Sequence, residues 1–172
     1  VWTGINGRDW NEITNWSGNA VPLTTNNVIV PNVTTSPVIQ TGESVQVNDI
    51  TIETLASFDI TGKGALTVDG SFTNNGTFAI SSDATNSGTL IVKGIANGSV
   101  TYERGGLLAN KWSIITAPVS GQSIKEFIEA PENNIRVNTS VTPHRYAVAY
   151  YDDTKAAGTK WTYYTADDIQ TN

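Results

Sequence analysis

The chain has 172 residues, a formal net charge of −6 and no cysteine. This acidic balance argues against nucleic acid and against an anionic membrane surface, because both need clustered Lys and Arg. The lack of cysteine excludes disulfides, thiol catalysis and Cys-ligated metals. No apolar run approaches the roughly 18 residues of a membrane span, so we expect no membrane insertion by this chain.

Residues 1–27 differ from the rest of the first hundred residues because they hold three tryptophans, Trp2, Trp10 and Trp16. The end of a repetitive β-structure exposes unpaired strand edges, and atypical sequence usually covers such an end. We therefore predict that residues 1–27 form an N-terminal cap that packs its tryptophans over the first repeat.

Residues 28–104 contain short runs in which apolar and polar side chains alternate, separated by Gly, Asn and Asp. Alternation predicts strands with one buried face and one wet face. Apolar positions recur after 20 to 24 residues: Phe58 and Phe78, Ile60 and Ile80, Ile52 and Phe72, Val30 and Ile52, Ile80 and Tyr102, Leu66 and Leu90. Such a return favours coils that stack on one another and share an apolar column.

The predicted fold class is all-β: a right-handed parallel β-solenoid (β-helix) with a Trp-rich cap, then a small β-rich module with one short helix. The alternative is an antiparallel sandwich, in which Asn75-Gly76 would form a hairpin turn. Steps of eight residues, from Ile52 to Ile60 to Val68, leave little room for long antiparallel strands.

Residues 105–172 form the second module. The run from Lys111 to Val119 predicts a strand that ends at a proline. Ser123 and Glu126 fit a capping box, and a proline at 131 ends the helix that follows. Residues 145–153 and 160–168 read as two strands around a turn. No closing element follows, which indicates a module that is incomplete at its C-terminus.

Catalytic groups are few. His144 is the only histidine, and it lies beside a proline without a nucleophile elbow, so we predict that the chain is not an enzyme and has no required cofactor. Four carboxylates occur as adjacent pairs, Asp152 with Asp153 and Asp167 with Asp168. Asp commonly bonds its own backbone in turns, and the same oxygens are candidate ligands for Ca²⁺.

Aromatic side chains concentrate in the last two predicted strands. Trp and Tyr rings stack on sugar faces, so the candidate ligand-binding residues are Trp161, Tyr163, Tyr164, Tyr150 and Tyr151. In an alternating strand one of each adjacent Tyr pair faces outward, and the other fills the core. Both roles, core filling and ligand platform, remain open at the level of sequence.

Four segments together resemble a known family. They are W-x-G-x5-W-x4-N-W from Trp2 to Trp16, GSVTYER from Gly98 to Arg104, WSIITAPVSGQSI from Trp112 to Ile124, and YAVAYY from Tyr146 to Tyr151. The chain resembles the repetitive stalk and adjoining module of large, adhesin-like surface proteins of Bacteroidota, especially flavobacteria. The resemblance implies export by the type IX secretion system and a place outside the cell or on the surface of a Gram-negative bacterium.

The expected function is therefore non-catalytic: a secreted or cell-surface fragment that serves as adhesin-like spacer, display or binding element. Expected partners are other cell-surface proteins or glycans. The alternatives are a carbohydrate-binding accessory module of a secreted glycan-degrading enzyme, and a subunit of a cell-surface complex.

Overall fold

The computed structural model describes residues 1–117 and 120–170 and divides into two compact units, Val1–Pro118 and Val119–Asn172. Within the described ranges, no helix is both long and apolar enough to cross a membrane.

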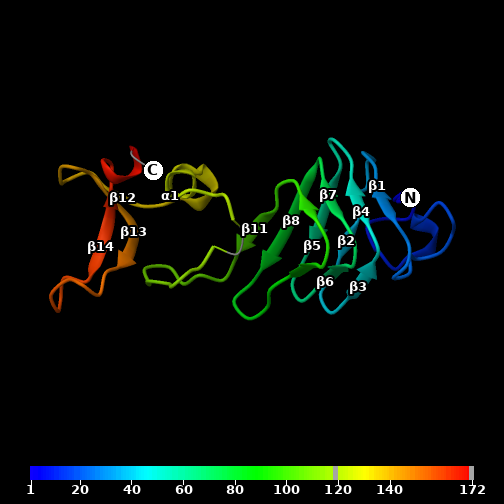
Figure 1. Ribbon diagram of the computed structural model, residues 1–172, viewed down its shortest axis with the longest axis horizontal. Coiled ribbons are helices and arrows are strands. Elements are labelled where there is room, and N and C mark those ends of the chain that lie inside the picture. Colours follow the sequence, from blue (N-terminus) through cyan, green and yellow to red (C-terminus); the bar gives the residue numbers. More distant parts are fainter. Residues whose placement is uncertain (118–119, 171–172) are drawn as a thin grey trace. The chain divides into compact units, whose positions relative to one another are not determined.

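The first unit is a parallel β-solenoid, so the predicted solenoid is confirmed and the antiparallel sandwich is not formed. Three sheets of stacked strands run along it (Figure 1). The first sheet contains β1 (Val28–Val30), β4 (Ile50–Ile52), β7 (Phe72–Asn74) and β10 (Ala96–Asn97); the second contains β2 (Val38–Ile39), β5 (Ser57–Ile60), β8 (Thr77–Ser82) and β11 (Thr101–Arg104); the third contains β3 (Ser44–Val47), β6 (Ala65–Val68) and β9 (Thr89–Val92).

The strand register follows most of the predicted returns. Phe58 lies beside Phe78, and Leu66 lies beside Leu90. One predicted match is wrong: Phe72 pairs with Ile50, and Ile52 pairs with Asn74. The predicted pairing is displaced by two residues from the observed one. Side chains at positions i and i+2 of a strand point to the same face, so the alternation of apolar and polar residues cannot distinguish the two pairings.

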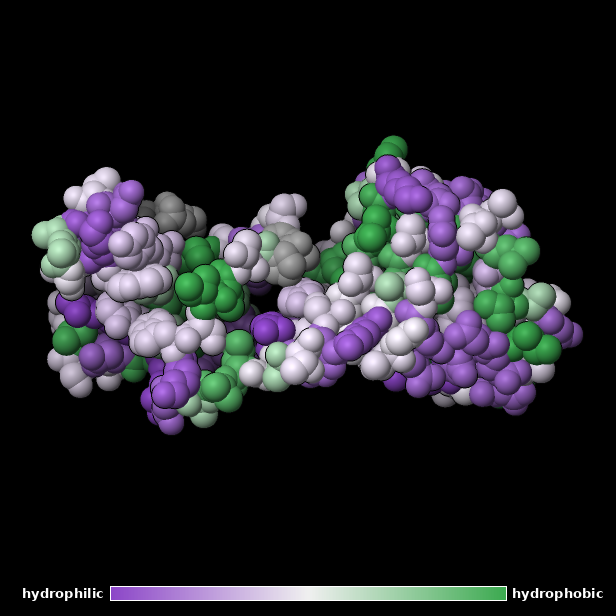
Figure 2. Space-filling view, turned by 90° about the horizontal axis from the view of Figure 1, so that it is seen from below, coloured by the Kyte–Doolittle hydropathy of each residue, from purple (hydrophilic) through white to green (hydrophobic). Residues whose placement is uncertain are grey.

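The inward-facing side chains of successive coils form one hydrophobic column. Phe58, Ile60, Leu66 and Val68 are fully buried, whereas Asp59 and Thr67, which alternate with them in β5 and β6, are only partly buried. In Figure 2 hydrophilic residues gather over one side of this unit, in the right half of the picture. A single coil could not bury these side chains, so the stacking of coils is what stabilises the unit.

The predicted cap is confirmed as a buried cluster of indole rings. Trp16 contacts Trp2 and Trp10 with ring centroids 5.1 and 4.7 Å apart. Trp10 in turn stacks on Phe58, at 5.3 Å and an interplanar angle of 12°. Buried Asn15, at the end of the 3₁₀ turn η1 (Ile13–Asn15), holds the cap loop by hydrogen bonds to the backbone of residues 6 and 9. The cap is therefore continuous with the solenoid core.

Two turns of the solenoid depend on particular residues. Asp83 accepts hydrogen bonds from the backbone N–H groups of Thr85 and Asn86, and from the Asn86 amide. These bonds lower the pKa of the Asp83 carboxyl to about 2, with the Thr85 N–H the largest cause. Gly98 has φ of +100°, and a Cβ there would lie 2.0 Å from the Asn74 carbonyl oxygen. Only glycine fits that position without strain.

The segment after Arg104 differs from the prediction. Residues 111–117 form no strand, and residues 118 and 119, which complete the predicted strand, lie outside the described residues. Strands need a neighbour for their backbone N–H and C=O groups, and no described strand pairs with this segment. Ile114 in this segment is consequently exposed. The predicted strand rested on apolar composition alone, which does not indicate whether a neighbouring strand is present.

The second unit contains α1 (Ile124–Glu129), η2 (Pro131–Asn133), β12 (Val137–Asn138), β13 (Arg145–Tyr151), β14 (Trp161–Thr165) and η3 (Asp168–Gln170). The capping box is confirmed: Ser123 Oγ accepts from the Glu126 N–H, and the Glu126 carboxylate accepts from the Ser123 N–H. The strands form an antiparallel sheet in the order β12-β13-β14, which confirms the predicted hairpin.

Candidate functional site

The solenoid coils and the sheet of the second unit differ in how they place their aromatic side chains. Every Phe and Trp of residues 1–104 is buried. In the sheet of the second unit, Trp161 is 56% exposed, Tyr151 55%, Tyr150 44% and Tyr163 38%. Rings of this size that are about half exposed leave a large apolar surface in contact with water. They mark the sheet β13–β14 as the candidate functional site.

One face of this sheet carries three of the exposed rings. Tyr151 on β13 lies directly opposite Trp161 on β14, and their ring centroids are 5.2 Å apart at 71°. Tyr163 lies two residues beyond Trp161, so it points to the same side of the sheet. We call Tyr151, Trp161 and Tyr163 the stacking face.

Lys160 borders the stacking face. Its Nζ lies 5.6 Å from the centre of the Tyr151 ring and donates a hydrogen bond to the Asp153 carbonyl at 2.8 Å. A cation over the ring face attracts it electrostatically. Together with the edge-on contact between Tyr151 and Trp161, this holds the two rings in place before any ligand binds.

The opposite face carries the other two candidates. Tyr150 lies across from Thr162, and its ring is 5.3 Å from that of Tyr164 at 54°. Tyr164 is half-buried, as expected for one member of the pair at 163 and 164. For the pair at 150 and 151 the expectation is wrong, because both rings are exposed. The sequence candidates thus divide into three on one face and two on the other.

The paired carboxylates do not converge. Asp152 accepts hydrogen bonds from the Oγ1 and N–H of Thr154, and Asp168 accepts from the Oγ1 and N–H of Thr165. These bonds, with the threonine hydroxyl as the largest cause, lower the pKa of both carboxyls. Asp153 and Asp167 are exposed. Across the described residues, no three His, Asp or Glu side chains gather as a metal site would require, and turn formation accounts for the bonds seen.

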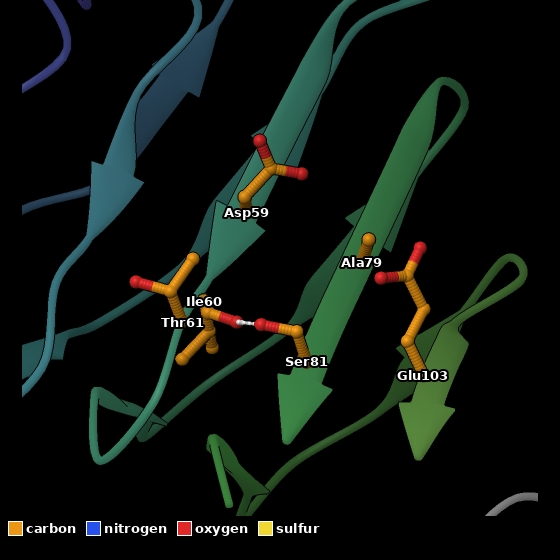
Figure 3. A pocket seen from close by; sticks show the side chains of 6 residues that line it. All are labelled: Asp59, Ile60, Thr61, Ala79, Ser81 and Glu103. Atoms are coloured by element: carbon orange, nitrogen blue, oxygen red, sulfur yellow. Dashed lines mark hydrogen bonds between the residues drawn. The ribbon is translucent and has the colours of Figure 1, made fainter. Parts of the chain in front are cut away.

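A small groove also lies on the outer face of the solenoid, with a volume of about 220 Å³. Figure 3 shows Asp59, Ser81 and Glu103 along three successive strands, with Ser81 Oγ donating to the Ile60 carbonyl at 3.4 Å. Arg8 forms an ion pair with Asp59.

The two carboxylates of this groove are poorly placed for joint acid–base chemistry. Asp59 on β5 and Glu103 on β11 are separated by β8, and the register places Glu103 two residues further along its strand than Thr101, which is in line with Asp59. Two strand spacings and this offset put their backbones about 12 Å apart. Hydrolysis of a glycosidic bond by two carboxylates needs a separation of roughly 5–9.5 Å. The groove therefore offers less chemistry than the sheet of the second unit does, and the stacking face remains the candidate site.

Comparison with known proteins gives a family but no activity. No curated protein and no solved structure matches the chain. The sequence model of one family, described as a domain of unknown function (DUF8693), matches residues 1–165. The match covers nearly the whole sequence and both units, and the chain therefore belongs to the DUF8693 family.

Proposed function

We propose that the chain is a non-catalytic binding element of an exported surface protein, in which the solenoid serves as spacer and the sheet β13–β14 recognises a glycan. The observation that carries the proposal is the stacking face: three exposed rings, Tyr151, Trp161 and Tyr163, on one side of a sheet. The proposal is one of adhesion or display rather than of chemical turnover.

The stacking face suits sugars for physical reasons. A pyranose ring presents an apolar face of C–H groups, which an indole or phenol ring covers, while its hydroxyls stay in water or meet polar groups at the rim. Tyr151 and Trp161 already contact each other at 5.2 Å, so binding would immobilise few further side-chain rotamers. Large rigid rings give contact area at a low entropy cost.

The structure of the solenoid supports the proposed spacer role. Successive coils are bonded to one another by parallel strand ladders in three sheets, and these ladders make the unit resist bending. Four stacked strands extend it by about 15 Å from first to last strand. The resemblance to flavobacterial surface proteins supports a place outside the cell and export by the type IX system, both of which belong to the proposal.

A second function uses the same face. The chain could be a carbohydrate-binding accessory module of a secreted glycan-degrading enzyme, which the exposed Trp161 favours equally. The two proposed functions involve the same glycan contact. In the first the contact attaches a surface protein to a glycan, and in the second it brings an enzyme to its substrate. A catalytic domain encoded in the same full-length gene would favour the accessory module, and a sorting domain without one would favour adhesion.

A glycan panel tests the proposal directly, using the 172-residue chain. We expect binding to at least one immobilised glycan, and at least a tenfold loss of affinity in Tyr151→Ala and in Trp161→Ala. The control is Tyr150→Ala, the neighbouring residue with a similarly exposed ring on the opposite face, which should keep wild-type affinity. The proposal is wrong if no glycan binds, or if the control loses binding as strongly as Tyr151→Ala does.

A further inference from the structure

An open groove of about 550 Å³ lies at the end of the stacking face and shares Tyr163 with it. Its other lining residues include Arg136, Asn138, Arg145 and Tyr146, from β12, from β13 and from the residue that precedes β12. Neither arginine was predicted to have a role.

The strand register brings the two arginines to one side of the sheet. Asn138 pairs with Arg145, and the Ala147 N–H donates to the Arg136 carbonyl at 2.8 Å. Residues directly opposite in an antiparallel pair share a face, as do residues two apart along a strand. Arg136 and Arg145 are therefore diagonal neighbours across β12 and β13.

Within the part of the chain that the structure describes, no protein anion pairs with either guanidinium group. Arg8, Lys93 and Lys125 all form ion pairs with carboxylates. By contrast, neither Arg136 nor Arg145 has an ion pair or a side-chain hydrogen bond within the described residues, and none of the residues that line the groove is acidic.

Two guanidinium groups in one groove, with no ion pair to any described residue, are suited to one class of ligand. Each presents parallel N–H donors in a fixed plane, which match the two oxygens of a carboxylate or the oxygens of a sulfate. The Asn138 amide and the Tyr146 hydroxyl are polar groups of the kind that bond sugar hydroxyls, and both residues line the same groove.

We infer that the glycan is anionic: a carboxylate or sulfate on one sugar binds between Arg136 and Arg145, while a neighbouring sugar stacks on Trp161 and Tyr151. This inference rests on the proposed function, and Tyr163 is the residue that joins the two subsites. The net charge of −6 makes the site specific in place: an acidic protein repels polyanions in general and binds one only where its cations are clustered.

The test uses glycans in matched pairs, each anionic member beside its neutral parent: oligogalacturonate with its methyl ester, sialyllactose with lactose, and a sulfated galactan oligomer with its unsulfated form. The variant is Arg136→Gln combined with Arg145→Gln. The control is Lys63→Gln combined with Lys111→Gln, which lowers the net charge equally at exposed positions of the first unit. Thermal melting confirms that all forms are folded.

We expect the wild type to bind the anionic member of at least one pair about tenfold or more tightly than its neutral parent. The double arginine variant should lose that preference but keep the affinity for the neutral parent, and the lysine control should keep both. The carboxylated and sulfated pairs show which oxyanion the groove prefers.

Other outcomes separate the two ideas. If the wild type binds both members of every pair equally, or if the arginine variant keeps the preference, the anionic-ligand inference is overturned while the proposed function stands. If no glycan binds at all, the proposed function fails and the inference fails with it; binding of an acidic peptide in that case would identify a protein partner instead.

Discussion

Replacement of Phe58 by alanine should destabilise the first unit more than any change at its surface. The side chain is fully buried, stacked on Trp10 of the cap and edge-on to Phe78 of the next coil, with both ring centroids 5.3 Å away. Truncation of a buried Phe costs about 3–5 kcal/mol. Each aromatic pair contributes about 0.5–1.5 kcal/mol beyond the buried area, so the effect should lie near the upper end of that range.

Guanidinium unfolding, followed by the fluorescence of the buried tryptophans, measures the free energy of unfolding. A double-mutant cycle of Phe58→Leu with Trp10→Leu should give a coupling of about 0.5–1.5 kcal/mol. The control is Ile91→Ala, which removes a half-exposed side chain and should cost far less. A coupling near zero, or equal losses for Phe58→Ala and Ile91→Ala, would refute the account of a continuous column from cap to coils.

Three further predictions concern the first unit. Trp16→Phe should cost about 1–3 kcal/mol more than Trp10→Phe in urea unfolding, because the Trp16 indole donates to a buried carbonyl at 2.8 Å whereas that of Trp10 meets no acceptor among the described residues; equal costs would contradict this. Gly98→Ala should lower the melting temperature well below that of Gly7→Ala, since both have φ of +100° but a Cβ would clash only at Gly98. An NMR titration of Asp83 should give a pKa of about 2. Because this pKa is depressed in the folded state, the ionised carboxylate stabilises the fold above about pH 4, and that contribution is lost as the pH falls to about 2. A titration midpoint of Asp83 near the ordinary 3.8 would contradict the turn geometry.

The solenoid could be predicted from the sequence because its coils repeat the same physical requirement. Apolar side chains at alternate positions must point inward, and the return from Phe58 to Phe78 fixes which strands stack. The mistaken match of Ile52 with Phe72 shows the limit of that reasoning: a shift by two residues keeps every side chain on its correct face.

Other features depend on contacts that no local pattern reports. The strand expected from Lys111 fails for lack of a neighbour, and β12 is only two residues long, too short to show alternation. The groove was missed for the same reason, since Arg136 and Arg145 lie nine residues apart and meet only through the pairing of β12 with β13. The alternating strand pattern did indicate Tyr151 and Trp161, but not that their rings would share a face.

The central claim is that the stacking face is a recognition surface, and an NMR titration of the chain with its best-binding glycan tests it most directly. We predict that the largest chemical-shift changes fall on Tyr151, Trp161 and Tyr163 and extend to the side chains of Arg136 and Arg145. Changes confined to Tyr150 and Tyr164 on the opposite face, or to the coils of the solenoid, would contradict the account.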